Sequence, residues 1–143
     1  LAFSNPLTVD EVAVRHPDLR IVMAHFGNPW MLDAAEVAKK NPNVWIDLSG
    51  LAIGIPDRED FCNRYHGYVE YLKSWLHYLD RYDRVLYGTD WPLVNMEAYL
   101  DLIRSFVPQE AWPLVFFENA CTVFPKLGRM VKEDLPTPWE TAR

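Results

Sequence analysis

Short apolar runs alternate with amphipathic segments along the chain. Three of these runs are bounded by turn residues and are typical of strands buried on both faces of a parallel sheet: residues 20–27, 44–50 and 84–90. Segments with helical spacing of apolar residues separate and follow the runs. This alternation predicts an α/β fold with a parallel sheet.

Helix signals fill the segments between the predicted strands. Thr8 and Glu11 have the spacing of a capping box, and Pro17 ends that first helix. Asn28 is a candidate N-cap for the second helix, with Pro29 at its first position. Later helices are predicted around residues 61–79, 96–106 and 116–124.

One stripe along the predicted helix over residues 61–79 is strongly apolar and aromatic. We interpret this stripe as core rather than as a cofactor site because its spacing places the side chains on one face. Its members are Phe61, Tyr65, Tyr68, Leu72, Trp75, Leu76 and Leu79.

Each predicted strand ends in polar residues. His25 follows the first apolar run, Asp47 and Ser49 end the second, and Thr89 and Asp90 end the third. The carboxyl ends of parallel strands share one face of an α/β sheet, and ligands bind there. The pattern therefore predicts that an imidazole and two carboxylates meet at a common pocket.

Each of these residues also has a structural interpretation. His25 would donate to a backbone carbonyl, and Asp47 would bond the backbone of the loop that it opens. Asp90 would cap the next helix, because Asp is a preferred N-cap and Pro92 lies close behind it. The gathering of all three at one rim favours a functional site, since caps and core histidines have no reason to cluster there.

Composition narrows the possible functions. The chain has 143 residues, half of them hydrophobic, and a formal charge of −6, which argues against a nucleic-acid partner. No apolar run is long enough to span a bilayer, so no membrane partner is expected. Cys62 and Cys121 are expected to be reduced thiols in a cytoplasmic protein. No self-sufficient zinc motif, serine elbow, phosphate loop or dinucleotide fingerprint is present.

Four stretches in order resemble landmarks of a known family: "PLTVDEVAVRHPDLRIVMAHFGNPW", "NPNVWIDLSG", "VLYGTDWP" and "FFENACTVF". They are similar to the amidohydrolase-related, metal-dependent TIM barrels that include aminocarboxymuconate semialdehyde decarboxylase. The resemblance implies that "HFG", "DLSG" and "GTDWP" close the sixth, seventh and eighth strands of a (β/α)8 barrel. It implies a C-terminal half-barrel over residues 1–127 and a polar tail over 128–143, which we expect to be poorly ordered from about Glu133.

The resemblance also implies roles for the site residues. Asp90 would ligate or abut a divalent metal, zinc or alternatively manganese, and handle the proton of the reaction. His25 would polarise or protonate the substrate. Asp47 would contact substrate or hold Ser49 and the following loop. Trp30 and Trp91 would form aromatic walls of the substrate pocket, with core packing as the alternative for both.

The metal histidines of the family's first and fifth strands would precede Leu1. We therefore expect an incomplete metal site, no turnover by this chain alone, and a need for the missing N-terminal half-barrel or for self-association through open sheet edges. Hydrolysis of a small carboxylated or carbonyl substrate through a metal-activated water is the expected activity, with non-oxidative decarboxylation as the alternative. A non-catalytic α/β binding or assembly module is the alternative of another class.

Overall fold

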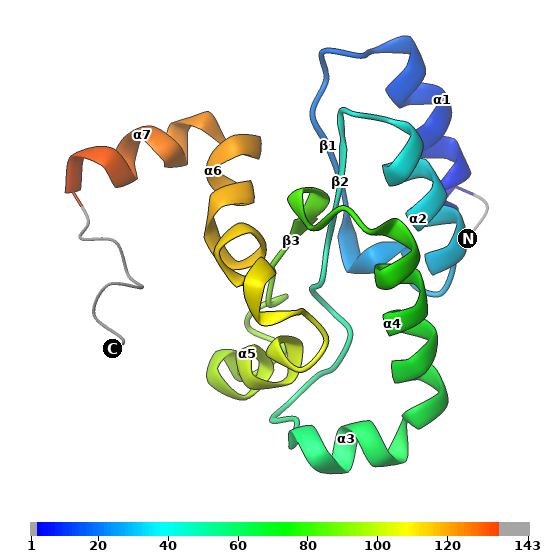
Figure 1. The fold of residues 1–143 in the computed structure, drawn as a ribbon, viewed down its shortest axis with the longest axis vertical. Coiled ribbons are helices and arrows are strands. Elements are labelled where there is room, and N and C mark those ends of the chain that lie inside the picture. The colour runs from blue at the N-terminus through cyan, green and yellow to red at the C-terminus, as the bar shows by residue number, and fades with distance from the viewer. Residues whose placement is uncertain (1–2, 135–143) are drawn as a thin grey trace.

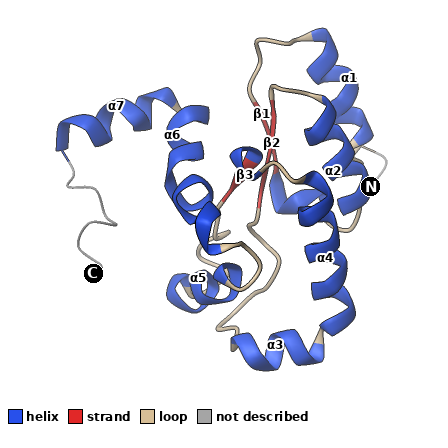
Figure 2. Cartoon of the chain, in the orientation of Figure 1, coloured by secondary structure: helices blue, strands red, loops and turns tan. Residues whose placement is uncertain are grey.

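A computed structural model describes residues 3–134, with side chains through Met130. Its strands are β1 (Ile21–Met23), β2 (Val44–Asp47) and β3 (Val85–Leu86), in the order β1-β2-β3. Both pairings are parallel: Met23 lies opposite Ile46, and Asp47 lies opposite Leu86. Figure 2 shows these strands in red at the centre of the chain. The predicted α/β class with a parallel sheet is confirmed.

Helices surround this sheet, and helical turns connect several of them. The α-helices are α1 (Leu7–Arg15), α2 (Met31–Lys40), α3 (Arg58–Arg64), α4 (His66–Leu79), α5 (Met96–Arg104), α6 (Asn119–Val123) and α7 (Pro125–Asp134). The turns are η1 (Ala24–Gly27), η2 (Tyr82–Arg84), η3 (Gln109–Ala111) and the π-helical η4 (Leu114–Glu118). α2 packs between α1 and α4, whereas α6 lies beside β3 (Figure 1).

The two faces of the sheet pack against different neighbours because side chains alternate along each strand. Val44, Ile46 and Val85 face the main core, which α2 and α4 complete. Trp45 and Leu86 face the other way and pack with Val123 of α6. Both faces of this short sheet are therefore covered, as its continuous apolar runs predict.

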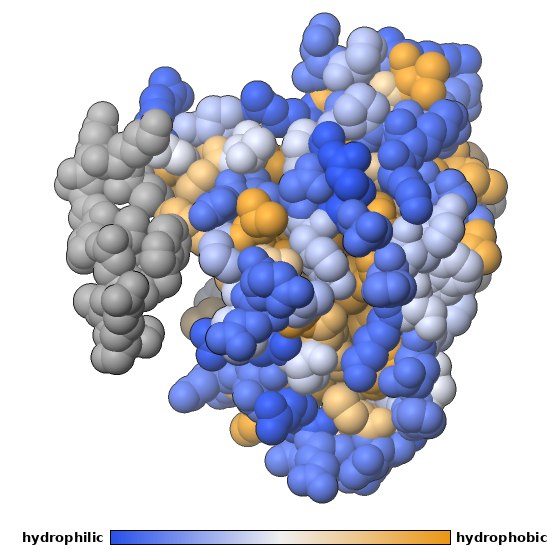
Figure 3. All heavy atoms as spheres, in the orientation of Figure 1, coloured by the Kyte–Doolittle hydropathy of each residue, from blue (hydrophilic) through white to orange (hydrophobic). Residues whose placement is uncertain are grey.

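Small residues let α2 and α4 approach each other closely. Ala34, Ala35 and Ala38 of α2 are buried, as are Leu72 and Leu76 of α4. Burial of each such leucine contributes roughly 1.5–3 kcal/mol. The surface in Figure 3 is mainly hydrophilic with separate apolar patches, as expected when the apolar helix faces turn inward.

Two buried asparagines fix the starts of β2 and β3. The Asn43 amide nitrogen contacts the carbonyl oxygens of Ala13, His16 and Leu19 at 3.2, 3.0 and 2.9 Å. The Asn119 amide donates to the carbonyls of Tyr82 and Val85, both at 2.7 Å. These bonds satisfy backbone groups that lie outside the sheet ladder and hold the strands in place.

The predicted helix starts are wrong in two places. Thr8 and Glu11 do not form a capping box: the helix begins at Leu7, the Thr8 hydroxyl donates to the Asn5 carbonyl, and the Asn5 side chain accepts from the Leu7 N–H. Asn28 does not cap α2, because the helix begins only at Met31 and Trp30 occupies its N-cap position. Local turn geometry overrides the sequence signal in both cases.

The predicted helix over residues 61–79 is two helices that meet at Tyr65, whose backbone (φ −106°, ψ 29°) leaves the helical region. The strands are shorter than predicted. β1 ends at Met23 because His25 and Phe26 adopt positive φ angles of 60° and 50°, which no strand accommodates.

The C-terminal segment continues as helix further than the sequence suggests. Residues 128–134 belong to α7, and the remainder of the predicted tail, 135–143, lies outside the described residues. Over the part of the chain that the structure describes, no helix combines the length and apolarity needed to cross a bilayer.

Candidate active site

The polar residues at the ends of β1 and β2 come together at one edge of the sheet, whereas no contact joins the Asp90 side chain to them among the described residues. His25 lies two residues beyond the end of β1, and Asp47 is the last residue of β2. The His25 backbone N–H donates to Asp47 Oδ1 at 3.0 Å, which joins the two strand ends directly. The carboxyl end of the sheet therefore gathers the imidazole and the first carboxylate.

Asp47 organises this edge by accepting three hydrogen bonds on Oδ1. Besides the His25 N–H, this oxygen accepts from the Ser49 backbone N–H at 2.9 Å and from the Ser49 hydroxyl at 2.5 Å. One carboxylate oxygen has two lone pairs, so these three donors crowd around a single acceptor atom. Asp47 thus fixes the loop that follows β2 and ties it to the turn that follows β1.

Ser49 links Asp47 to the His25 ring. Its hydroxyl oxygen lies 2.9 Å from His25 Nδ1. A hydroxyl carries a single proton, and the Ser49 proton points to Asp47 Oδ1. His25 Nδ1 must then donate to the Ser49 oxygen, so in the neutral imidazole Nε2 is the unprotonated nitrogen. The chain Asp47–Ser49–His25 therefore selects a tautomer with a basic Nε2.

Two glycines let this network close. A methyl group on Gly50 would lie 2.4 Å from His25 Nδ1, and Gly50 also has a φ of +63°. A methyl group on Gly88, just beyond β3, would lie 3.0 Å from Ser49 Cβ and 3.7 Å from Asp47 Oδ1. All three strand ends thus contribute to the same small volume.

Asp90 lies on the loop after β3 with an exposed side chain. Its φ is +59°, an uncommon conformation for a residue other than glycine. No hydrogen bond or ion pair joins its carboxylate to another residue within the described range. The carboxylate is therefore available for a ligand.

Asp90 does not cap the following helix. α5 begins only at Met96, and the Asn95 side chain caps it by accepting from the Ala98 N–H at 3.0 Å. The loop before it is held elsewhere, since Gly54 pairs with Val94 in a short parallel bridge. The alternative in which Asp90 only caps a helix that begins near Trp91 or Pro92 is wrong.

The two tryptophans have different environments. Trp30 precedes α2 and is half-buried, and its backbone N–H donates to the Gly27 carbonyl at 2.8 Å. Trp91 is 69% exposed, so core packing does not explain it. Both follow a strand-end residue of the candidate site, and their role as aromatic walls stays a prediction.

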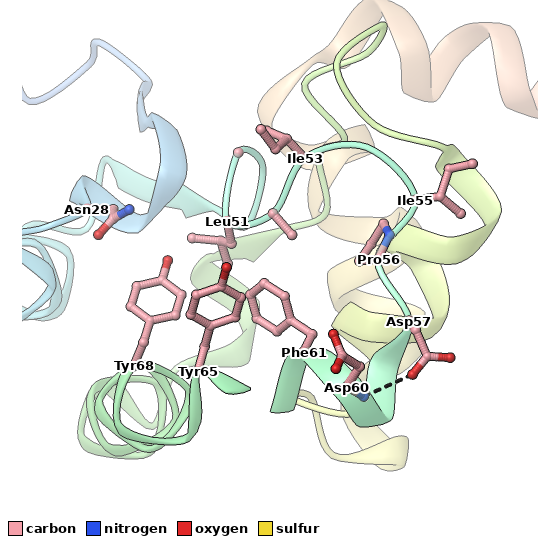
Figure 4. Close-up of a pocket in the computed structure, with 12 residues that line it drawn as sticks. Asn28, Leu51, Ile53, Ile55, Pro56, Asp57, Asp60, Phe61, Tyr65 and Tyr68 are labelled. Atoms are coloured by element: carbon pink, nitrogen blue, oxygen red, sulfur yellow. Dashed lines mark hydrogen bonds between the residues drawn. The ribbon is translucent and has the colours of Figure 1, made fainter. Parts of the chain in front are cut away.

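A pocket of about 470 Å³ adjoins this edge (Figure 4). Gly50 and Leu51 of the loop after β2 line it, together with Phe61, Tyr65 and Tyr68. The sequence interpretation of all three aromatics as core is wrong for Tyr65, which is 48% exposed. The tyrosine hydroxyl was the available signal, because it favours positions that reach water.

We next consider whether the described residues have the donor groups to hold a metal ion. They contain no group of three His, Cys, Asp or Glu side chains that could hold an ion. The Asp90 carboxylate has no partner among the described residues, and the Ser49 contact leaves His25 Nε2 free, so each side chain could be one zinc donor. Any complete site needs ligands from beyond the residues described.

The comparisons with known proteins agree with this architecture. The sequence model of the amidohydrolase family matches residues 1–126. A TIM-barrel protein from Bordetella bronchiseptica, Bb4693, superposes with a TM-score of 0.66 at 22% identity, over 90% of this chain and 42% of its own.

An amidohydrolase from Burkholderia multivorans superposes with a TM-score of 0.62 at 19% identity, over 84% of this chain and 49% of its own. It has been solved with bound HEPES and with bound zinc. The search of curated proteins gives no match. The chain spans less than half the length of these solved structures, and its fold matches part of theirs. With the family match over residues 1–126, this chain belongs to the amidohydrolase family.

Proposed function

We propose that this chain forms the last three strands of a (β/α)8 barrel, the sixth to eighth, in a metal-dependent hydrolase. The substrate would be a small molecule with a reacting carbonyl or carboxyl group. The hydrogen-bonded chain from Asp47 through Ser49 to His25 carries this proposal, because it prepares one histidine nitrogen at the ligand-binding edge of a parallel sheet.

His25 would act through Nε2. The Ser49 contact holds the proton on Nδ1, so Nε2 is free to accept a proton or, once protonated, to donate one to the substrate. His25 also adopts a left-handed backbone conformation, as does Asp90. Such conformations cost of order 1–2 kcal/mol each and cluster at functional sites, which supports a shared catalytic role.

Asp90 would supply one metal ligand, and the remaining ligands would come from strands outside this chain. A divalent metal, when bound, acts as a Lewis acid that activates water and polarises a carbonyl. The metal would be zinc or manganese, and the zinc-bound Burkholderia multivorans structure supports the first choice. Asp47 would hold the Ser49 loop and, with Trp30 and Trp91, shape the substrate pocket.

The two outer strands of the sheet support the proposal that a further half-barrel is needed. β1 and β3 are the outer strands of the sheet, and a closed barrel would pair both. We propose that a further half-barrel pairs them, or that copies of the chain associate through them, and that this chain alone is inactive. Cys62 and Cys121 are free thiols, which fits a reducing compartment such as the cytoplasm.

The alternative within the same family is non-oxidative decarboxylation, which uses the same Asp and His. The experiment compares wild type, Asp90→Asn and His25→Gln in the natural full-length protein loaded with zinc. p-Nitrophenyl acetate reports hydrolysis, and carbon dioxide release from 2,3-dihydroxybenzoate reports decarboxylation.

We expect both variants to lose at least about 100-fold in kcat on whichever probe the wild type turns over, with unchanged circular dichroism. Asp90→Asn should also lower the zinc content, whereas His25→Gln should not. Full activity in either variant would remove that residue from the mechanism, and equal zinc content in wild type and Asp90→Asn would remove Asp90 from the metal site.

A further inference from the structure

The pocket beside His25 has a lining that identifies the class of molecule it can accept. It measures about 470 Å³, enough for a substituted ring, and Gly50 belongs both to its lining and to the surroundings of His25. A methyl group on Gly50 would lie 2.4 Å from His25 Nδ1. Gly50 is therefore the residue through which the pocket adjoins the surroundings of His25, which is not itself a lining residue.

The charged residues of the lining are all acidic. Asp57 and Asp60 line the pocket, and none of its twelve lining residues is Lys, Arg or His. Asp57 accepts the Asp60 backbone N–H at 2.9 Å as the N-cap of α3. Arg64 lies 3.5 Å from Asp60 on the exposed face of the helix, where such a pair is weak and screened. Asp57 and Asp60 are exposed as well, so they disfavour an anionic group by an amount that salt screens, and no basic lining residue offsets this effect.

Aromatic rings form one side of the pocket. Phe61 and Tyr65 lie with their ring centroids 4.9 Å apart, and Tyr68 stands next to them (Figure 4). Leu51 and Ile53 of the loop after β2 line the opposite part. This arrangement offers flat apolar surfaces to a bound ring, the interaction that aromatic side chains make best.

The polar groups near the aromatic side are uncharged. In Figure 4 the Asn28 side chain lies nearest the hydroxyl end of Tyr68, and it makes no hydrogen bond to the described residues. Burial raises the pKa of Tyr68 to about 12, so its hydroxyl stays protonated and adds no negative charge at neutral pH. Asn28 can therefore hydrogen-bond a neutral oxygen of a ligand.

We propose that this pocket binds an aromatic portion of the substrate that carries no negative charge, and that it rejects a carboxylate there. This inference rests on the proposed function, since it takes His25 as the neighbour of the reacting group. It narrows the substrate to a molecule whose reacting carbonyl or carboxyl lies at the strand ends and whose remaining part is an uncharged or cationic ring.

Three phenols of matched size test the proposal: tyramine is cationic, 4-ethylphenol is neutral and 3-(4-hydroxyphenyl)propionate is anionic. Their dissociation constants are measured by ligand-observed NMR on the natural full-length protein at low ionic strength. We expect the propionate to bind roughly tenfold more weakly than tyramine, with 4-ethylphenol between them. In the Asp57→Asn/Asp60→Asn variant the difference should shrink to about twofold or less, and Asn keeps the helix cap.

A matched pair of variants locates the binding. Tyr65→Ala should weaken all three phenols by about fivefold, because it removes one aromatic surface of the pocket. Tyr71→Ala, on α4 outside the pocket and 40% exposed, should leave their binding unchanged. Circular dichroism checks that both variants fold.

Tightest binding of the propionate, no binding of any phenol in the millimolar range, or equal effects of Tyr65→Ala and Tyr71→Ala would overturn the proposal. The proposed function fails separately, through full activity in Asp90→Asn or His25→Gln. The phenol measurements use no turnover, so the two failures are distinguishable.

Discussion

Substitution of Gly50 by alanine tests the packing of the His25 ring. The added methyl group would lie 2.4, 2.7 and 3.0 Å from the ring atoms Nδ1, Cε1 and Cγ. Non-bonded carbon contacts are optimal at about 3.5–4.0 Å, so the ring must move by roughly 1 Å. That movement would break the 2.9 Å contact between Nδ1 and the Ser49 hydroxyl.

Gly54 provides the matched control. It has a φ of +75°, similar to the +63° of Gly50, but a methyl group there would meet nothing within 4 Å. Gly54→Ala should therefore cost only the backbone strain of about 1–2 kcal/mol. Gly50→Ala should cost this strain plus roughly 1 kcal/mol for the lost hydrogen bond.

The assay has two readouts on the natural full-length protein. Denaturant unfolding measures the free-energy difference between the two variants, and ¹⁵N NMR of the histidine ring reports which nitrogen of His25 carries the proton. Displacement of the ring should lower kcat by about 100-fold in Gly50→Ala and leave it near wild type in Gly54→Ala. Equal stability, equal activity and an unchanged His25 tautomer in both variants would refute this account of the site.

Three further predictions concern the fold. Asn119→Leu should destabilise the protein by about 1–3 kcal/mol in denaturant unfolding, because it leaves two carbonyls that Asn119 pairs without a partner; wild-type stability would contradict the role of this amide. Gly67→Ala should stabilise it by up to about 1 kcal/mol, since Gly67 lies in α4 and a methyl group there meets nothing within 4 Å; a loss of stability would contradict this. The Lys40 hydrogen bond is the main cause that lowers the pKa of Asp10 below 3.8. Asp10 therefore stabilises the fold above pH 3.8 and loses this contribution as the pH falls through the lowered pKa. Asp10→Asn should flatten the acid side of the curve of unfolding free energy against pH. An unchanged curve would contradict a stabilising contact between Asp10 and Lys40.

The order of strands and helices could be predicted because the spacing of apolar residues is visible in the sequence alone. The strand ends could not, since they depend on backbone geometry. Nothing in "MAHFG" predicts that His25 and Phe26 adopt positive φ angles, and this turn ends β1 at Met23. The break between α3 and α4 at Tyr65 was also not predictable. The helical spacing of apolar residues continues across Tyr65, but its backbone angles are not helical.

For the site, the sequence placed His25 and Asp47 at a common edge because parallel strands impose that arrangement. It left open whether Asp90 caps a helix, because Asp and Pro appear in both contexts. The structure resolves this point through Asn95, whose side chain takes the capping role five residues later. The contribution of Gly50 depends on a close approach between loops, which no local pattern encodes.

If the Asp90 carboxylate and the His25 ring serve one metal-dependent site, zinc must bind Asp90 at the end of the sheet that carries His25. The most direct measurement is a crystal structure of the natural full-length protein soaked with zinc, with an anomalous difference map at the zinc edge. We expect a zinc peak bound to the Asp90 carboxylate, at the same end of the sheet as His25, and the loss of this peak in Asp90→Asn. A zinc peak that avoids Asp90, or one that persists unchanged in the variant, would contradict it.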